Sequence, residues 1–136
     1  FRSLTVNWFE NSSILKIIKL AAEQGFKLVI TTDHGMVYVK KPSHVVGDRE
    51  TSTNIRYKTG KSLTYDEKDV WAITNPEKLF LPKGNLSSKY IFAKNNIFLA
   101  YPKNYNHFVN YYKDTYQHGG ISLEEIIIPI SILEPK

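Results

Sequence analysis

A helical pattern that leads through one glycine into a short apolar run constrains the fold more than any other feature. Residues 11–13 are Asn-Ser-Ser, whose side-chain oxygens suit the start of a helix. Apolar residues then recur at helical spacing, namely Ile14, Ile17, Ile18 and Ala21. Gly25 is placed to end the helix in a left-handed conformation. The run at 28–30, Leu-Val-Ile, is typical of a strand covered on both faces. We therefore predict the helix–strand half of an α/β unit.

Further along the chain, the pattern alternates between short strands and one helix. We expect strands at 37–39 and 55–58, and a β-hairpin formed by 89–93 and 97–101 around Asn95-Asn96. Aromatic residues at helical spacing predict a helix at 105–116 whose stripe packs into the core. Ser122 and Glu125 match a capping box, and an Ile-rich strand follows at 126–133. Pro129 cannot donate to a strand ladder, so this strand should lie at an edge or begin pairing late.

Composition narrows the class of protein. With 136 residues, 42% of them hydrophobic, the chain can bury a core, and we expect one domain or part of one. No apolar run is long enough to span a bilayer, so we expect no membrane insertion. The absence of cysteine excludes disulfides and thiolate metal sites and is compatible with a cytoplasmic protein. Because the sequence begins with Phe1 and its one methionine is Met36, we expect a piece of a longer chain.

Positive charge is concentrated in one segment, residues 40–61. This segment carries +4 of the net charge of +5 and holds every arginine except Arg2. It also contains hydroxyl and amide side chains between Thr51 and Asn54 that can donate to phosphate oxygens. Arginine binds phosphate bidentately, so an anion-binding loop is one reading. A solvated basic loop is the other, and the composition alone leaves both open.

Two short motifs contain side chains that can bind metal. Asp33-His34-Gly35 follows the predicted strand, at the end where open α/β sheets place ligands. His118-Gly119-Gly120 follows the predicted helix, and its glycines permit close approach of the backbone to a ligand. Each motif also has an ordinary structural explanation. Asp33-His34 can be a hydrogen-bonded pair at a strand end, and His118 can interact with a helix dipole.

The combination of these motifs resembles the C-terminal half of an alkaline phosphatase superfamily domain. The resemblance rests on an apolar strand running into Thr32-Asp33-His34-Gly35-Met36, then His118-Gly119-Gly120, the capping box and the Ile-rich strand. Within the superfamily, residues 46–61 point to the PglZ domain. The resemblance implies a three-layer α/β/α fold of which residues 1–136 form the C-terminal portion.

The resemblance also implies a site that binds two zinc ions and handles phosphate esters. Asp33 and His34 match the pair that binds one zinc ion, and His118 matches the late histidine that binds the other. The nucleophile and the remaining ligands have no match in this chain, so we expect them outside it. The residues expected to bind substrate phosphate are Arg49, Thr51, Arg56, Lys58 and Lys61.

The resemblance further extends to PglZ-containing response regulators that control type IX secretion in Bacteroidetes. It implies a phosphodiesterase or phosphatase output domain, with a phosphate-ester substrate such as an oligonucleotide or a cyclic nucleotide. Signalling proteins are expected partners, and exposed strand edges make a homodimer plausible. Two other functions stay open at this point. One is a regulatory interaction module with a vestigial metal site, and the other is a nucleotide- or nucleic-acid-binding module that depends on the basic charge.

Overall fold

The segment after Ser12 forms the predicted helix in the computed structural model, which describes residues 2–84 and 87–135. The helix, α2 (Ser13–Glu23), is preceded by another, α1 (Arg2–Glu10), that the pattern did not predict. Gly25 adopts φ +77°, and the amide of Phe26 donates to Ala21 O, so the helix ends as expected. The side chain of Ser12 does not cap α2. Its hydroxyl donates instead to Phe9 O at 2.7 Å, in α1.

The described chain divides into two compact units. The first contains the residues up to Asp33 together with those from Ile128 on, and the second contains His34–Ile127. The boundary therefore passes between the two members of the Asp33-His34 pair.

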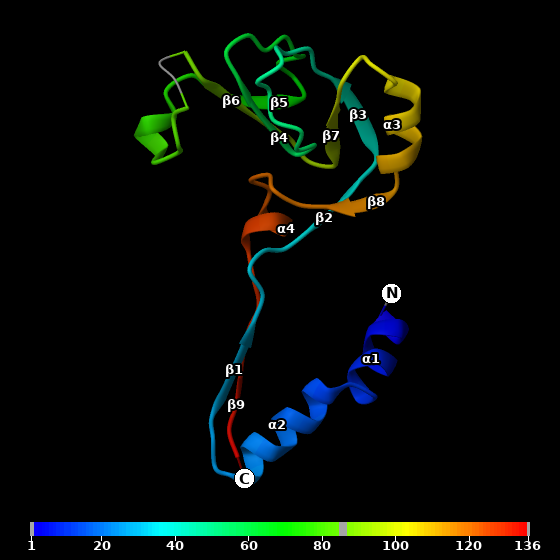
Figure 1. Ribbon diagram of the computed structural model, residues 1–136, viewed down its shortest axis with the longest axis vertical. Helices are drawn as coiled ribbons and strands as arrows, with labels where there is room; N and C mark the ends of the chain where they lie inside the picture. The colour runs from blue at the N-terminus through cyan, green and yellow to red at the C-terminus, as the bar shows by residue number, and fades with distance from the viewer. Residues whose placement is uncertain (1, 85–86, 136) are drawn as a thin grey trace. The chain divides into compact units, whose positions relative to one another are not determined.

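In the first unit, two strands that are distant in sequence lie side by side (Figure 1). β1 (Leu28–Thr31) pairs antiparallel with β9 (Ile130–Leu133), and Val29 stands opposite Ile132. Pairing begins after Pro129, as its missing amide predicts. The expectation that β1 is covered on both faces is wrong. Val29 is 62% exposed, and none of the described residues of this unit is buried.

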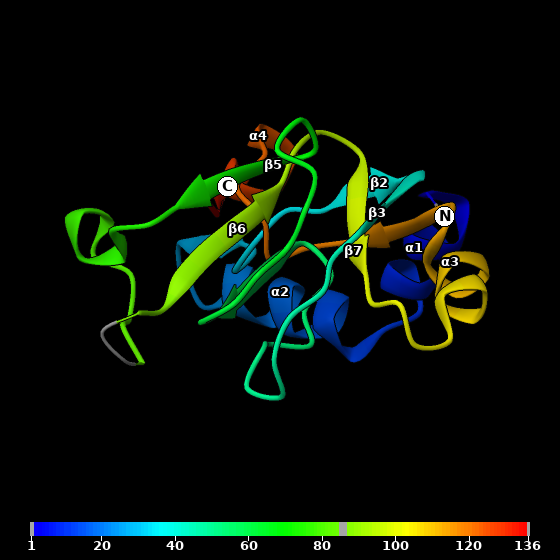
Figure 2. The ribbon, with the colours of Figure 1, turned by 90° about the horizontal axis from the view of Figure 1, so that it is seen from above.

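The second unit contains three small sheets. Their elements are β2 (Val37–Val39), β3 (Lys41–His44), β4 (Tyr57–Gly60), β5 (Val70–Ile73), η1 (Pro76–Leu79), β6 (Lys89–Ala93), β7 (Ile97–Ala100), α3 (Tyr105–Tyr112), β8 (Thr115–Gln117) and α4 (Leu123–Ile126). β6 lies between β4 and β5 and is antiparallel to both, and β3 runs parallel to β7 (Figure 2). β2 and β8 form an antiparallel ladder. Strands and helices together make the chain mixed α/β, as predicted.

The predicted hairpin at 89–101 is wrong in its pairing. Both strands exist, and Asn95 adopts a left-handed φ of 45° in the turn between them. β7, however, pairs with β3, while β6 pairs with β4 and β5. The turn at Asn95 therefore connects two strands that belong to different sheets. The strand expected at 55–58 begins two residues later, as β4, and β3 arises inside the segment expected to be a loop.

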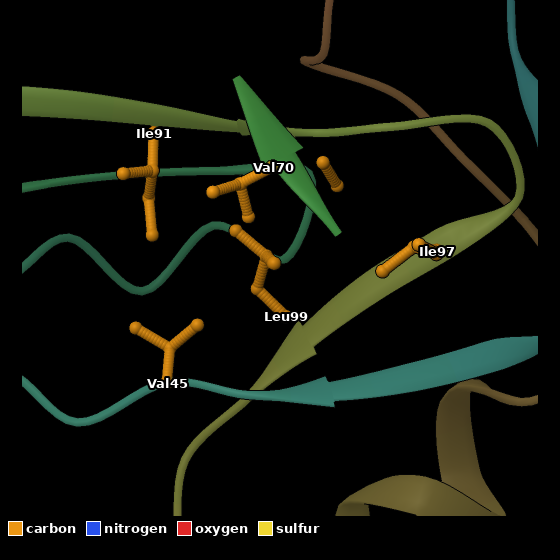
Figure 3. Close-up of a cluster of buried hydrophobic side chains, with 6 residues drawn as sticks. Val45, Val70, Ile91, Ile97 and Leu99 are labelled. Atoms are coloured by element: carbon orange, nitrogen blue, oxygen red, sulfur yellow. The ribbon is translucent and has the colours of Figure 1, made fainter. Parts of the chain in front are cut away.

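The core of the second unit is built around β7, whose four residues are all buried. Ile97 and Leu99 face a cluster that also contains Val45, Val70, Ile91 and Ala93 (Figure 3). Phe98 and Ala100 point to the other side, where they pack with β2 and with Tyr105, Val109 and Tyr112. This alternation follows from the two-residue period of a strand. The predicted aromatic stripe is confirmed only in part, because Tyr112 packs on the core while Phe108 and Tyr111 are exposed. The helix expected at 105–116 ends at Tyr112.

No helix in the described ranges 2–84 and 87–135 is long and apolar enough to cross a membrane.

Candidate metal centre

The ladder between β2 and β8 brings the two histidine motifs together. Val37 pairs with Gln117, so His118 lies one residue beyond the ladder and His34 lies three residues before it. The two imidazole rings are stacked, with centroids 3.8 Å apart and planes inclined by 12°. His118 is exposed and His34 is half-buried. Two segments separated by more than eighty residues thus present a pair of imidazoles on one side of the second unit.

The His34 ring is held to the backbone through one of its two nitrogens. Its Nδ1 lies 2.8 Å from Gly35 O, and a carbonyl only accepts, so this hydrogen bond requires the proton on Nδ1. Nε2 is then the unprotonated nitrogen, the form that binds a metal. A histidine ligand commonly donates its other ring N–H to a carbonyl in this way.

The donor set fits part of a zinc centre. Imidazole nitrogen is a preferred zinc ligand, but a structural or catalytic zinc ion takes at least three protein ligands. Within 2–84 and 87–135, no group of three or more His, Cys, Asp or Glu side chains is arranged to hold a metal ion. Asp33 is exposed, and its carboxylate accepts from Thr32 Oγ1 at 3.3 Å. Asp33 belongs to the first unit. Among the predicted ligands, the ladder of the second unit brings His34 and His118 together.

Glu125 organises the backbone around both histidines. Its carboxylate accepts from Gly120 N at 2.9 Å, from Ser122 N at 3.1 Å and from Ser122 Oγ at 2.8 Å. Its carbonyl accepts from Gly35 N at 2.8 Å. The sequence identifies Glu125 only as the acidic member of a capping box, which is present.

Arg56 pairs with Glu125 inside the protein. Its Nε and Nη2 donate to the two carboxylate oxygens at 2.9 and 2.8 Å, and Nη1 donates to Ile97 O. Both side chains are buried. Burial by itself would raise the pKa of Glu125, but the hydrogen bonds from Arg56, Ser122 and Gly120 outweigh it and hold that pKa below its ordinary value. This geometry does not favour contact between Arg56 and a substrate phosphate.

Lys58 is also engaged internally. Its Nζ donates to Ser52 O at 3.1 Å and lies 4.6 Å from the centre of the Tyr101 ring. The side chain is buried. Burial penalises the charged ammonium and lowers the pKa of Lys58 to about 8. The buried cations of the basic segment, Arg56 and Lys58, therefore bind partners inside the protein.

The outer part of the segment faces solvent. Arg49 is exposed, as is Lys61, whose Nζ lies 2.8 Å from Glu50 Oε2. Thr51 is buried, and its hydroxyl donates to Asp48 Oδ1 at 3.3 Å. Of the residues predicted to bind phosphate, Arg49 and Lys61 thus lie at the surface of the described structure.

Asp48 closes this outer loop, a role that the sequence analysis missed. Its Oδ1 accepts from Glu50 N at 2.9 Å, and its Oδ2 accepts from the backbone amides of Lys61 at 3.2 Å and Ser62 at 3.3 Å. Slight desolvation would raise the pKa of Asp48, but these amides outweigh it and lower that pKa. Aspartate followed within three residues by a hydroxyl is the local signal that would have indicated the turn.

Comparison with known families assigns the chain. The sequence profile described as the BREX system PglZ alkaline phosphatase-like domain matches residues 7–132. The chain belongs to the PglZ family. The match spans both compact units and includes both histidine motifs and the whole basic segment. A search of curated proteins found no match.

Proposed function

We propose that this PglZ domain hydrolyses phosphate esters, as a phosphodiesterase or phosphatase, at a centre that holds two zinc ions. The stacked pair of His34 and His118 carries the proposal. Family membership supports it, because the family is described as alkaline phosphatase-like.

In this proposal each histidine contributes to a different ion. His34 acts together with Asp33, its neighbour in sequence, and His118 serves the second ion. When bound, the ions would stabilise charge on the attacking and leaving oxygens of an in-line displacement. The bond from His34 Nδ1 to Gly35 O fixes the ring and its tautomer before any ion binds.

The outer part of the basic segment is proposed to attract the substrate. Arg49 is the exposed guanidinium there, and Lys61 is the exposed ammonium next to it in the Asp48-closed loop. A guanidinium binds a phosphate bidentately. A linear oligonucleotide or a cyclic nucleotide is the proposed substrate class, since both carry phosphodiester groups.

The biological setting is also a proposal. We infer an output domain of a response regulator connected with type IX secretion, in the cytoplasm, with signalling proteins as partners and a homodimer as a possible assembly. The support is the overall sequence resemblance to PglZ-containing response regulators, within which residues 46–61 point to the PglZ domain itself. Pull-down of the full-length protein with the secretion signalling components, with and without receiver phosphorylation, tests this setting.

Zinc content and hydrolysis of bis(4-nitrophenyl) phosphate, measured on the full-length protein, test the catalytic proposal. His118→Ala should lose bound zinc and at least about a hundredfold in kcat/KM, because removing one ligand leaves an ion underfilled. His107→Ala is the matched control, since His107 is an exposed histidine on α3. Equal zinc content and activity in the two variants would contradict the proposal.

The alternative is a regulatory interaction module with a vestigial metal site. Its support is that Arg56 and Lys58, two of the cations expected to bind phosphate, are engaged inside the protein. Normal signalling by the His118→Ala variant, with zinc absent, would support the interaction module and exclude catalysis as the essential role.

A further inference from the structure

The bidentate pair of Arg56 and Glu125 joins segments 69 residues apart. The side chains are 0% and 1% exposed. The guanidinium also donates to Ile97 O, in the core strand β7. Through this bond the carboxylate of Glu125 is tied to the most deeply buried strand of the second unit.

From this anchored position, Glu125 is bonded to both histidine segments. Its side chain accepts from the amides of Gly120 and Ser122, which lie two and four residues after His118. Its carbonyl receives the amide of Gly35, which follows His34 directly. A single residue therefore sets the position of both loops that present the imidazoles.

The packing leaves these loops little room to shift. A Cβ atom at Gly35 would lie 2.0 Å from Glu124 O, and one at Gly120 would lie 2.5 Å from Glu125 Oε2. Gly119 adopts φ +102°, and a Cβ atom there would lie 2.8 Å from Asn54 Nδ2. Asn54 in turn accepts from the Arg56 amide through Oδ1 at 2.8 Å. The Glu125 carboxylate thus contacts the backbone turn after His118, and the backbone amide of Arg56 bonds to Asn54, which lies close to that turn.

We propose that Arg56 and Glu125 form a positioning pair that fixes His34 and His118 in the mutual geometry needed to bind metal. The inference rests on the proposed function and deepens it. The pair acts through the two histidine loops and does not touch the ligand. A buried ion pair adds little net stability compared with well-packed apolar residues, so its main effect here is on geometry.

If the pair acts by positioning the histidines, replacing it should weaken zinc binding much more than it lowers stability. In the Arg56→Met/Glu125→Leu double variant, apolar side chains of similar size replace the pair, and no buried charge is left unpaired. We expect this variant to fold with a somewhat lower thermal midpoint than the wild type, because the amides of Gly120 and Ser122 lose their acceptor. It should bind zinc more weakly by about ten- to a hundredfold, the usual loss when an outer partner of a ligand is removed.

The experiment measures the zinc dissociation constant of the full-length protein by calorimetric titration with zinc chloride. Glu125→Gln keeps the shape and one hydrogen-bond acceptor, and it should lose about tenfold in affinity. Glu124→Gln is the matched control at the exposed neighbouring carboxylate and should bind as the wild type does. Wild-type zinc affinity in both the double variant and Glu125→Gln would overturn the positioning role and leave the proposed function standing.

A second readout does not involve metal. In the metal-free protein, NMR contacts between the His34 and His118 ring protons should be present in the wild type and Glu124→Gln and lost in Glu125→Gln. If the wild type binds no zinc through these histidines, the proposed function fails, and this measurement still tests the pair. Ring contacts that persist in a folded Glu125→Gln variant would overturn the inference. If Glu125→Gln does not fold, ring contacts that persist in the folded Arg56→Met/Glu125→Leu double variant would overturn the inference instead.

Discussion

Two halves of one basic segment differ in where their cations lie. Arg49 and Lys61 are exposed, on the loop closed by Asp48, whereas Arg56 and Lys58 are buried. Arg56 has a bidentate partner in Glu125, and Lys58 has only a carbonyl and an aromatic ring. The number of basic residues in a segment of sequence therefore does not show which of them can contact a ligand. The effect of burying a cation also depends on its partner. Arg56 pairs with a carboxylate, whereas Lys58 has none and its pKa is lowered.

The largest effect is expected from the buried arginine. Arg56→Met leaves Glu125 buried without its counter-ion, so the free energy of unfolding should fall by about 3–5 kcal/mol. Urea unfolding at neutral pH measures it. Arg49→Met, at the exposed arginine of the same segment, should stay within about 0.5 kcal/mol of the wild type. Similar losses in the two variants would remove the distinction between the inner and outer cations.

Lys58 should produce a dependence of stability on alkaline pH. Its pKa is about 8 in the folded protein and 10.5 ordinarily, so between these values the unfolded chain binds more protons. The unfolding free energy of the wild type should therefore rise with pH across this window, by about 2–3 kcal/mol relative to Lys58→Met. Urea unfolding at pH 7 and pH 10.5 measures the change.

Lys61 supplies the control for this pH dependence. Its hydrogen bond to Glu50 raises its pKa, so the stability it contributes is present below the ordinary value and is lost as pH rises. The stability of the wild type relative to Lys61→Met should consequently fall weakly as pH rises, opposite to its trend relative to Lys58→Met. A rise with pH in the wild type that survives in Lys58→Met would show that another group causes it.

The smallest effect concerns substrate capture. Arg49→Ala should raise KM for a phosphodiester by about tenfold with little change in kcat, because it removes one charge-assisted hydrogen bond made before and during reaction. Steady-state kinetics at two salt concentrations measure it. An unchanged KM together with unchanged salt dependence would show that Arg49 does not face the substrate.

Features that depend on neighbouring residues were predicted well from the sequence. The end of α2 at Gly25 follows from the left-handed freedom of glycine, and the Ser122–Glu125 capping box follows from two side chains three residues apart. Late pairing after Pro129 follows from a missing amide. In each case the physical cause lies within one turn of the chain.

Features that depend on distant partners were not predicted. An apolar run such as Leu28–Thr31 indicates a strand, but its partner, β9, lies about a hundred residues away. The turn at Asn95 resembles a hairpin, yet long-range pairing with β3 separates β7 from β6. No residue near Arg56 in the sequence indicates that it is buried, because its partner Glu125 lies 69 residues away.

The candidate site shows the same division. His34 and His118 were identified because glycines flank them, and their approach depends on the β2–β8 ladder. The role of Asp33 stays a prediction. The family match over residues 7–132 confirms the PglZ resemblance, although it does not assign a role to any single residue.

The central claim is that the buried Arg56, through Glu125, positions the histidine pair and that the exposed Arg49 does not. Zinc affinity of Arg56→Lys and Arg49→Lys, measured side by side on the full-length protein, tests it most directly. Lysine keeps the charge but loses the bidentate fork, so Arg56→Lys should bind zinc about tenfold more weakly, while Arg49→Lys should match the wild type. Wild-type zinc affinity in Arg56→Lys, or an equal loss in both variants, would contradict the account.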